Sequence, residues 1–125
     1  MSQTLAVLGA STNRHKFGNK CVRAFAHAGW SVVPVNPKPE PIEGFATARS
    51  LADITVPLDA ISVYLPPPVT ASMLEEIAAA EAGTVWFNPG AADADVLRKA
   101  DDLGIAAHDA CSIVAIGLSP SQFPG

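Results

Sequence analysis

The 125-residue chain carries 8 basic and 12 acidic residues, a formal net charge of -4, and is 49% hydrophobic. This length predicts one domain over residues 1–125 with a real core, and the composition excludes wholesale disorder. The acidic balance, the absence of a long apolar stretch and the lack of a signal peptide exclude a nucleic-acid partner and a membrane role, so we expect a cytoplasmic protein.

The first predicted element is a strand followed by an anion-binding turn. Residues 5–8 are apolar and predict a strand buried on both faces, which ends at Gly9. A helix opens near residue 17 or 18, where unpaired backbone N–H groups attract an anion. The turn between them offers the hydroxyls of Ser11 and Thr12 and the charges of Arg14 and Lys16. We interpret it as a phosphate site, although Gly9-x-Ser11 departs from G-x-G-x-x-G and an ordinary strand-to-helix turn is the alternative.

The segment after this turn predicts a helix, an edge strand and a rigid loop. Helical spacing places Val22, Phe25 and Ala26 on a buried face, and Gly29 ends the helix. The solvent face is expected to hold Asn19, Lys20, Arg23 and His27. Residues 31–35 predict a strand whose Pro34 nitrogen faces away from a partner, and alternating prolines keep residues 36–41 extended.

The second half of the chain continues the alternation. Residues 42–57 give mixed signals, with a short edge strand at 45–46 and a helical turn at 50–54. Strands are expected at 60–65, 84–87 and 105–108. One helix follows an N-cap at Thr70 or Ser72, with Glu75 completing a capping box. A last helix starts near Asp93, with Val96, Leu97, Ala100 and Leu103 on its buried side. From about residue 113 we expect an irregular tail, loose or lying against the body through Phe123.

Strands and helices that alternate with short connections predict an α/β fold, a doubly wound parallel sheet in three layers. Ligands bind such sheets beyond the carboxyl ends of the strands. The loops to inspect are therefore residues 9–16, 36–38, 65–68, 88–90 and 109–112. Their prolines form a rigid apolar wall, and Asn36 and Asn88 can donate and accept hydrogen bonds, although both residue types also simply shape turns.

The end of the second strand distinguishes between cofactors. NAD-binding proteins usually place an acidic residue there, whereas this chain has Asn36-Pro37-Lys38. A lysine favours a phosphate, either the 2′-phosphate of NADP or the 3′-phosphate and diphosphate of coenzyme A. A solvated surface lysine is the alternative.

No convincing catalytic set is present. His108, Asp109 and Cys111 lie near the expected crevice, but neighbours in a strand point to opposite faces. Cys111 could form a mixed disulfide with a CoA thiol, or be an inert packed cysteine. Cys21 and Cys111 fit no metal-ligand spacing and are expected to be thiols.

Five segments in order carry a resemblance to a known family. They are Gly9-Ala-Ser11, Val35-Asn-Pro-Lys38, Tyr64-Leu-Pro-Pro67, Val85-Trp-Phe-Asn-Pro-Gly90 and Asp109-Ala-Cys111. This set, spread over residues 4–112, resembles the small stand-alone CoA-binding proteins, which are related to the CoA-binding domain of the succinyl-CoA synthetase alpha subunit.

The resemblance implies a Rossmann-type domain that binds coenzyme A or an acyl-CoA without catalysis, as a sensor, carrier or regulatory module. The cofactor-binding residues are then expected among Gly9, Ala10, Ser11, Arg14, Lys16, Asn36, Pro37, Lys38, Leu65, Pro66, Pro67, Asn88, Pro89, Gly90 and Cys111. An NADP-dependent oxidoreductase and a partner-docking regulatory protein with a vestigial pocket are the alternatives. Exposed edge strands favour a homodimer.

Overall fold

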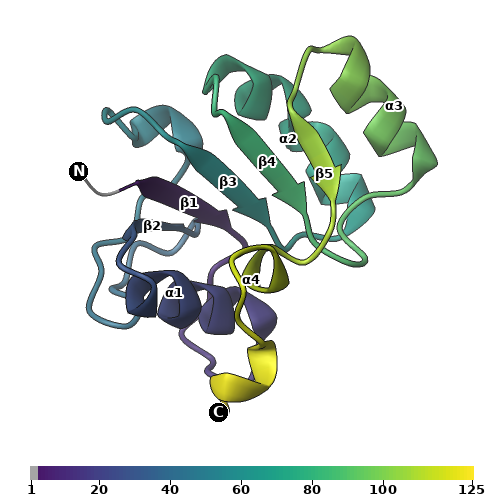
Figure 1. The fold of residues 1–125 in the computed structure, drawn as a ribbon. Helices are drawn as coiled ribbons and strands as arrows, with labels where there is room; N and C mark the ends of the chain where they lie inside the picture. The colour runs from purple at the N-terminus through teal and green to yellow at the C-terminus, as the bar shows by residue number, and fades with distance from the viewer. Residues whose placement is uncertain (1–2) are drawn as a thin grey trace.

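A computed structural model describes residues 3–125, and within them five parallel strands form one twisted sheet (Figure 1). The strands are β1 (Thr4–Leu8), β2 (Ser31–Val35), β3 (Ala60–Val63), β4 (Thr84–Phe87) and β5 (Ala107–Asp109). Their order is β2-β1-β3-β4-β5, so the chain winds outward in both directions from β1. The prediction of a doubly wound parallel sheet is confirmed.

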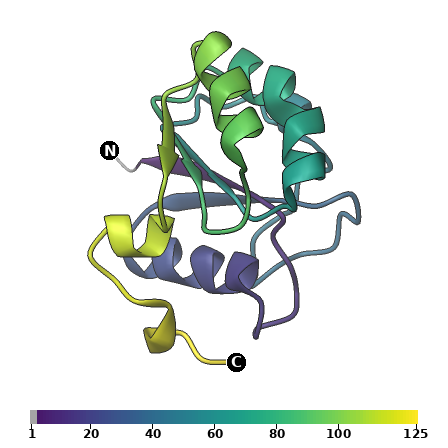
Figure 2. The same cartoon turned by 90° about the vertical axis from the view of Figure 1, so that its right-hand side faces the viewer.

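Helices cover both faces of the sheet and give three layers (Figure 2). α1 (Phe17–His27) and α4 (Ser112–Ala115) lie on one face, and α2 (Pro67–Ala79) and α3 (Ala94–Asp102) lie on the other. Two 3-10 turns, Leu51–Asp53 and Pro120–Gln122, complete the described structure.

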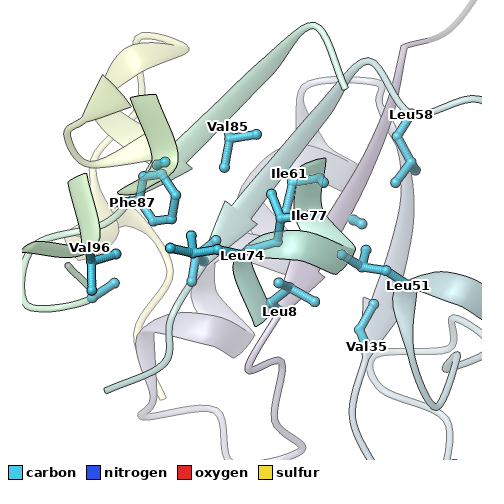
Figure 3. Packing of buried hydrophobic residues seen from close by; sticks show 14 residues of the cluster. Leu8, Val35, Leu51, Leu58, Ile61, Leu74, Ile77, Val85, Phe87 and Val96 are labelled. Atoms are coloured by element: carbon cyan, nitrogen blue, oxygen red, sulfur yellow. The ribbon is translucent and has the colours of Figure 1, made fainter. Parts of the chain in front are cut away.

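The core forms two clusters because successive side chains of a strand point to opposite faces. Leu8, Ile61 and Phe87 of the sheet pack with Leu74 and Ile77 of α2 (Figure 3). The second cluster joins β1 to α1 and α4 on the opposite face through Leu5, Val7, Val22, Phe25 and Ile113. Each helix therefore depends on the sheet for most of its stability.

The start of α2 differs from its prediction. The helix begins at Pro67 instead of after a cap at Thr70 or Ser72. Prolines fit the first turn of a helix because the N–H groups there have no intrahelical partner. The expected strand at 60–65 correspondingly ends at Val63, and the Thr70 hydroxyl donates to the Leu65 and Pro66 carbonyls inside the first turn.

Two side chains lie on the opposite side from the one expected. Asn19 was predicted on the solvent face of α1 but is fully buried, because it makes hydrogen bonds that only the folded loops supply. Leu103 was predicted on the buried side of α3 but is 38% exposed, since the helix ends at Asp102 and Leu103 is its C-cap.

The end of the chain is more ordered than expected. Residues 112–115 form α4 and residues 120–122 form a 3-10 turn capped by Ser119, which accepts from the Ser121 N–H. Phe123 lies against His27 with ring centroids 6.0 Å apart, as the prediction of contact through Phe123 requires. Hydrophobic contacts of Ile113 and Phe123 with the α1 layer account for this order.

Candidate functional site

A crevice of about 880 Å³ lies at the carboxyl ends of β1 to β4. The segments at and after the ends of these strands line it, with residues 9–11, 15–18, 35–37, 64–67 and 89–91. Strand order reverses at β1, which pairs with β2 on one side and β3 on the other. Sheets of this kind bind ligands at that reversal.

Two glycines bring the loop after β1 close to its neighbours. Gly9 has a φ of +83°, and a Cβ there would collide with the Tyr64 carbonyl. A Cβ at Gly18 would collide with the Gly9 carbonyl. The N-terminus of α1 can therefore sit beside the end of β1 only with glycine at both positions.

Short-range hydrogen bonds shape the loop between these glycines. The Asn13 N–H donates to Ser11 Oγ over 3.0 Å, and the His15 N–H donates to Asn13 Oδ1 over 3.0 Å. Lys16 is the N-cap of α1, and no side chain caps the helix there. The first-turn amides and the positive end of the helix dipole thus face the crevice beside the Lys16 side chain, which favours an anion.

The side chains of Asn19 and Arg23 support this loop through hydrogen bonds. Asn19 Nδ2 donates to the Ser11 carbonyl over 2.8 Å, and Arg23 Nε donates to Asn19 Oδ1 over 2.8 Å. Arg23 also donates to the Arg14 carbonyl over 2.9 Å and to the Phe123 carbonyl over 3.0 Å. Sequence reasoning missed this support because it depends on backbone carbonyls of two loops, at Ser11 and Arg14 and at Phe123, which helical periodicity does not indicate.

Arg14 does not line the crevice. Its guanidinium donates to Glu43 Oε1 over 2.7 Å, and the other Glu43 oxygen accepts from Asn19 Nδ2 over 3.1 Å. The Arg14 charge is therefore largely matched by Glu43. Nothing in the local sequence indicates this pair, since 29 positions separate the two residues.

The loop after β2 is tied to the loop after β1 through Asn36. Asn36 Nδ2 donates to the Ala10 carbonyl over 2.8 Å, and its Oδ1 accepts from the Lys38 N–H over 2.9 Å. Lys38 lines a hollow of about 190 Å³ that shares Ser11 and Asn36 with the crevice. Lys38 and Glu40 both line this hollow, so it holds one basic and one acidic side chain.

Asn88 is a structural support beneath the site. Its Nδ2 donates to Ser62 Oγ over 2.8 Å and to the Val63 carbonyl over 2.9 Å. Its Oδ1 accepts from the Ser112 N–H over 2.8 Å. The side chain is buried, so these bonds connect β3, the loop after β4 and the start of α4.

Asn88 belongs to a polar cluster with Cys21, Ser62 and Ser112, which are buried, and with Tyr64, which is half-buried. The Ser62 and Ser112 hydroxyls are 2.8 Å apart, and Ser112 Oγ lies 3.2 Å from the Tyr64 hydroxyl and 3.6 Å from Cys21 Sγ. Burial raises the pKa of Cys21 to about 11. Burial also raises the pKa of Tyr64 well above its usual value, so both groups stay protonated at neutral pH.

Cys111 lines a small pocket of about 120 Å³ that also includes Phe17, Tyr64, Asn88 and Pro89. Phe17, Tyr64 and Pro89 line the main crevice as well, so the two spaces adjoin. Cys111 hydrogen-bonds to no base within residues 3–125. His108 and Asp109 are exposed on β5 and line neither space.

The structure brings most of the candidate residues together. The crevice is lined by Gly9, Ala10, Ser11, Lys16, Asn36, Pro37, Leu65, Pro66, Pro67, Pro89 and Gly90. Lys38, Asn88 and Cys111 border adjoining spaces, and Arg14 points elsewhere. His15, Phe17 and Tyr64 also line the crevice. Their positions after glycine turns and at strand ends were the only sequence signal for them.

Neither a metal centre nor a membrane span is found in the part of the chain that the structure describes. No three His, Cys, Asp or Glu side chains of residues 3–125 gather as metal ligands would. No helix in this range combines the length and apolar character needed to cross a bilayer.

Comparison with known proteins places this geometry in context. The family model described as the CoA binding domain matches residues 3–117. The uncharacterized protein YneT of Bacillus subtilis (strain 168) is 25% identical over 103 residues, which cover 82% of this chain and 76% of YneT.

Solved structures share the fold closely. A conserved hypothetical protein from Pyrococcus furiosus is 31% identical with a TM-score of 0.83, over 90% of this chain and 98% of that one. A protein from Thermus thermophilus is 30% identical with a TM-score of 0.83, over 90% of this chain and 87% of that one. A dinucleotide-forming acetyl-coenzyme A synthetase from Ca. Korarchaeum cryptofilum is 18% identical with a TM-score of 0.72, and 25% of its length is covered, so it shows likeness of fold alone.

Proposed function

The chain belongs to the CoA-binding domain family, and from that premise we propose that it binds coenzyme A or an acyl-CoA without catalysis, as a sensor, carrier or regulatory module. In this proposal the crevice holds the nucleotide and diphosphate. The hollow at Lys38 receives the 3′-phosphate.

One observation carries the proposal: anion-binding and apolar groups share a single large crevice. The first-turn amides of α1 and the Lys16 side chain supply positive potential at one wall. Pro37, Pro66 and Pro67 supply rigid apolar surface on which a planar base can lie. A volume of about 880 Å³ is near the upper end of ordinary ligand sites, which suits a ligand as large as CoA.

The surroundings of Cys111 support a binding role over catalysis. A nucleophilic thiol needs an adjacent base, and within residues 3–125 Cys111 hydrogen-bonds to none. His108 and Asp109 lie outside the crevice. The bound thioester or thiol would therefore lie beside a thiol that has no neighbouring base to activate it.

Calorimetric titration of the ligand-stripped protein with CoA, NADP and NAD tests the proposal. We expect CoA to bind and the two nicotinamide cofactors to bind at least about tenfold more weakly. Preference for NADP favours an oxidoreductase instead. Failure of all three favours a partner-docking protein whose crevice is vestigial.

Replacement of Lys38 by alanine tests the position of the 3′-phosphate. Loss of a charge-assisted contact weakens CoA binding by about 1 to 3 kcal/mol. Dephospho-CoA lacks that phosphate, so its affinity should be unchanged in the titration. Lys99→Ala, an exposed lysine on α3 away from the crevice, is the matched control. Equal losses for CoA and dephospho-CoA exclude this role for Lys38.

A further inference from the structure

The small pocket at Cys111 lies on the opposite side of β1 from the Lys38 hollow. The hollow is formed by the loops after β1 and β2, and the pocket by residues that follow β3, β4 and β5 together with Phe17. The strand order β2-β1-β3-β4-β5 separates these two sets. CoA carries its 3′-phosphate at one end and its sulfur at the other. A molecule whose phosphate meets Lys38 therefore extends its sulfur toward the pocket.

The size of the pocket selects a short group. The pocket has a volume of about 120 Å³, against about 880 Å³ for the crevice that it adjoins. An acetyl thioester is the kind of small group that suits such a space. A long acyl chain would have to leave it.

The chemistry of the lining selects an uncharged group. Phe17, Pro89 and Cys111 present apolar or weakly polar atoms, and no charged side chain lines the pocket. Both N–H groups of Asn88 already donate to Ser62 Oγ and the Val63 carbonyl. The carboxylate of a succinyl or malonyl group would be buried there without a partner, at a large cost in free energy.

The Tyr64 hydroxyl is the donor that a ligand can meet at this pocket. Ser62 Oγ accepts from Asn88 Nδ2 and from the Cys21 thiol, so its own hydrogen goes to Ser112 Oγ. Ser112 Oγ lies 3.2 Å from Tyr64 Oη and 3.6 Å from Cys21 Sγ, and either atom of each pair can be the donor. When Ser112 donates to Tyr64 Oη, the Tyr64 O–H is left to donate to a ligand. Burial keeps that group protonated.

We propose that this pocket is an acyl subsite, which takes the acetyl-sized, uncharged acyl group of a short acyl-CoA while the Tyr64 O–H donates to the thioester carbonyl oxygen. The ligand is then an acyl-CoA in preference to free CoA. This inference rests on the proposed function and specifies the ligand class.

Titration under reducing conditions with CoA, acetyl-CoA, succinyl-CoA and octanoyl-CoA tests the subsite. One added hydrogen bond makes acetyl-CoA bind roughly 3- to 10-fold more tightly than CoA. Succinyl-CoA and octanoyl-CoA should lose that gain. Equal affinities for acetyl-CoA and CoA overturn the subsite and leave the proposed function standing, whereas failure of CoA and every acyl-CoA to bind overturns both.

Two variants assign the preference to this pocket. Tyr64→Phe removes only the hydroxyl, and we expect it to weaken acetyl-CoA more than CoA, so that the two ligands bind with similar affinity. Cys111→Leu places a larger side chain in the pocket and should weaken the binding of acetyl-CoA more than the binding of CoA. Val114→Ala, on the exposed side of α4, is the control and should keep the preference. Equal weakening of both ligands by Tyr64→Phe, or a preference that survives both pocket variants, contradicts the assignment.

Discussion

The loop after β1 and the buried cluster around Asn88 are both polar, but they are held together in different ways. In the loop, Ser11, Asn13 and His15 bond to each other two positions apart, near solvent. In the cluster, Asn88, Ser62 and Ser112 bond across separations of 24 to 50 positions, out of contact with water. An unmade hydrogen bond is cheap where water replaces it and costly where water is excluded.

This difference separates two roles within one site. The loop presents amides and a cation to the ligand, so a change there should alter affinity. The cluster fixes the relative positions of β3, β4 and α4, so a change there should alter stability first. α1 takes part in both, because Cys21 faces the cluster while Phe17 and Gly18 line the crevice.

The largest effect is expected from Asn88→Ala. It removes the acceptor of the buried Ser112 N–H and one donor each from Ser62 Oγ and the Val63 carbonyl, which keep their bonds to Ser112 Oγ and to the backbone N–H of residue 88. The free energy of unfolding, measured by urea denaturation, should fall by about 3 to 5 kcal/mol. Asn13→Ala removes an exposed loop amide and should cost less than about 1 kcal/mol. Similar losses in the two variants would remove the distinction between loop and cluster.

An intermediate effect is expected from pH, through Cys21. Burial raises the pKa of this thiol from 9.0 to about 11, so the folded state favours the neutral form. The contribution of the thiol to the free energy of unfolding is fully present below its pKa in the unfolded chain. It is lost as the pH rises through the pKa in the folded protein, and the loss amounts to about 2 to 3 kcal/mol.

Comparison with Cys21→Ala isolates this contribution, because Tyr64 titrates in both proteins. Thermal or urea unfolding between pH 8 and pH 11 should show that stability falls more steeply with pH in the wild-type protein than in the variant. The steeper fall should cover the interval of roughly two pH units between the unfolded and the folded pKa of Cys21. Parallel curves for the two proteins would show that the thiol is not desolvated in the fold.

The smallest effect is expected from Ser11→Ala. It removes one neutral hydroxyl from the loop, which should weaken CoA binding roughly 3- to 10-fold by calorimetry. Stability should change by less than about 0.5 kcal/mol, because Ser11 Oγ makes only an exposed bond to the Asn13 N–H. Ser72→Ala, an exposed serine on α2, is the control. Unchanged CoA affinity in Ser11→Ala would place the diphosphate elsewhere.

The amino-acid sequence by itself determined the sheet and the location of the crevice. Apolar runs and glycine or proline breaks marked β1, β2 and β4, and the alternation with helices required parallel strands whose carboxyl ends meet. The loop after β1 could also be predicted from the sequence, because Ser11 and Lys16 act through neighbours a few positions away and Gly9 marks the turn itself.

Only the tertiary structure decided which polar side chains face a ligand and which support the fold. Asn88 was expected at the opening and proved to be a buried support, while Arg14 proved to be matched by Glu43. Asn19 was expected in solvent and proved to hold the loop. Each outcome depends on a partner more than 20 positions away or on a backbone group of another loop, and hydrophobic periodicity carries no information about such a partner.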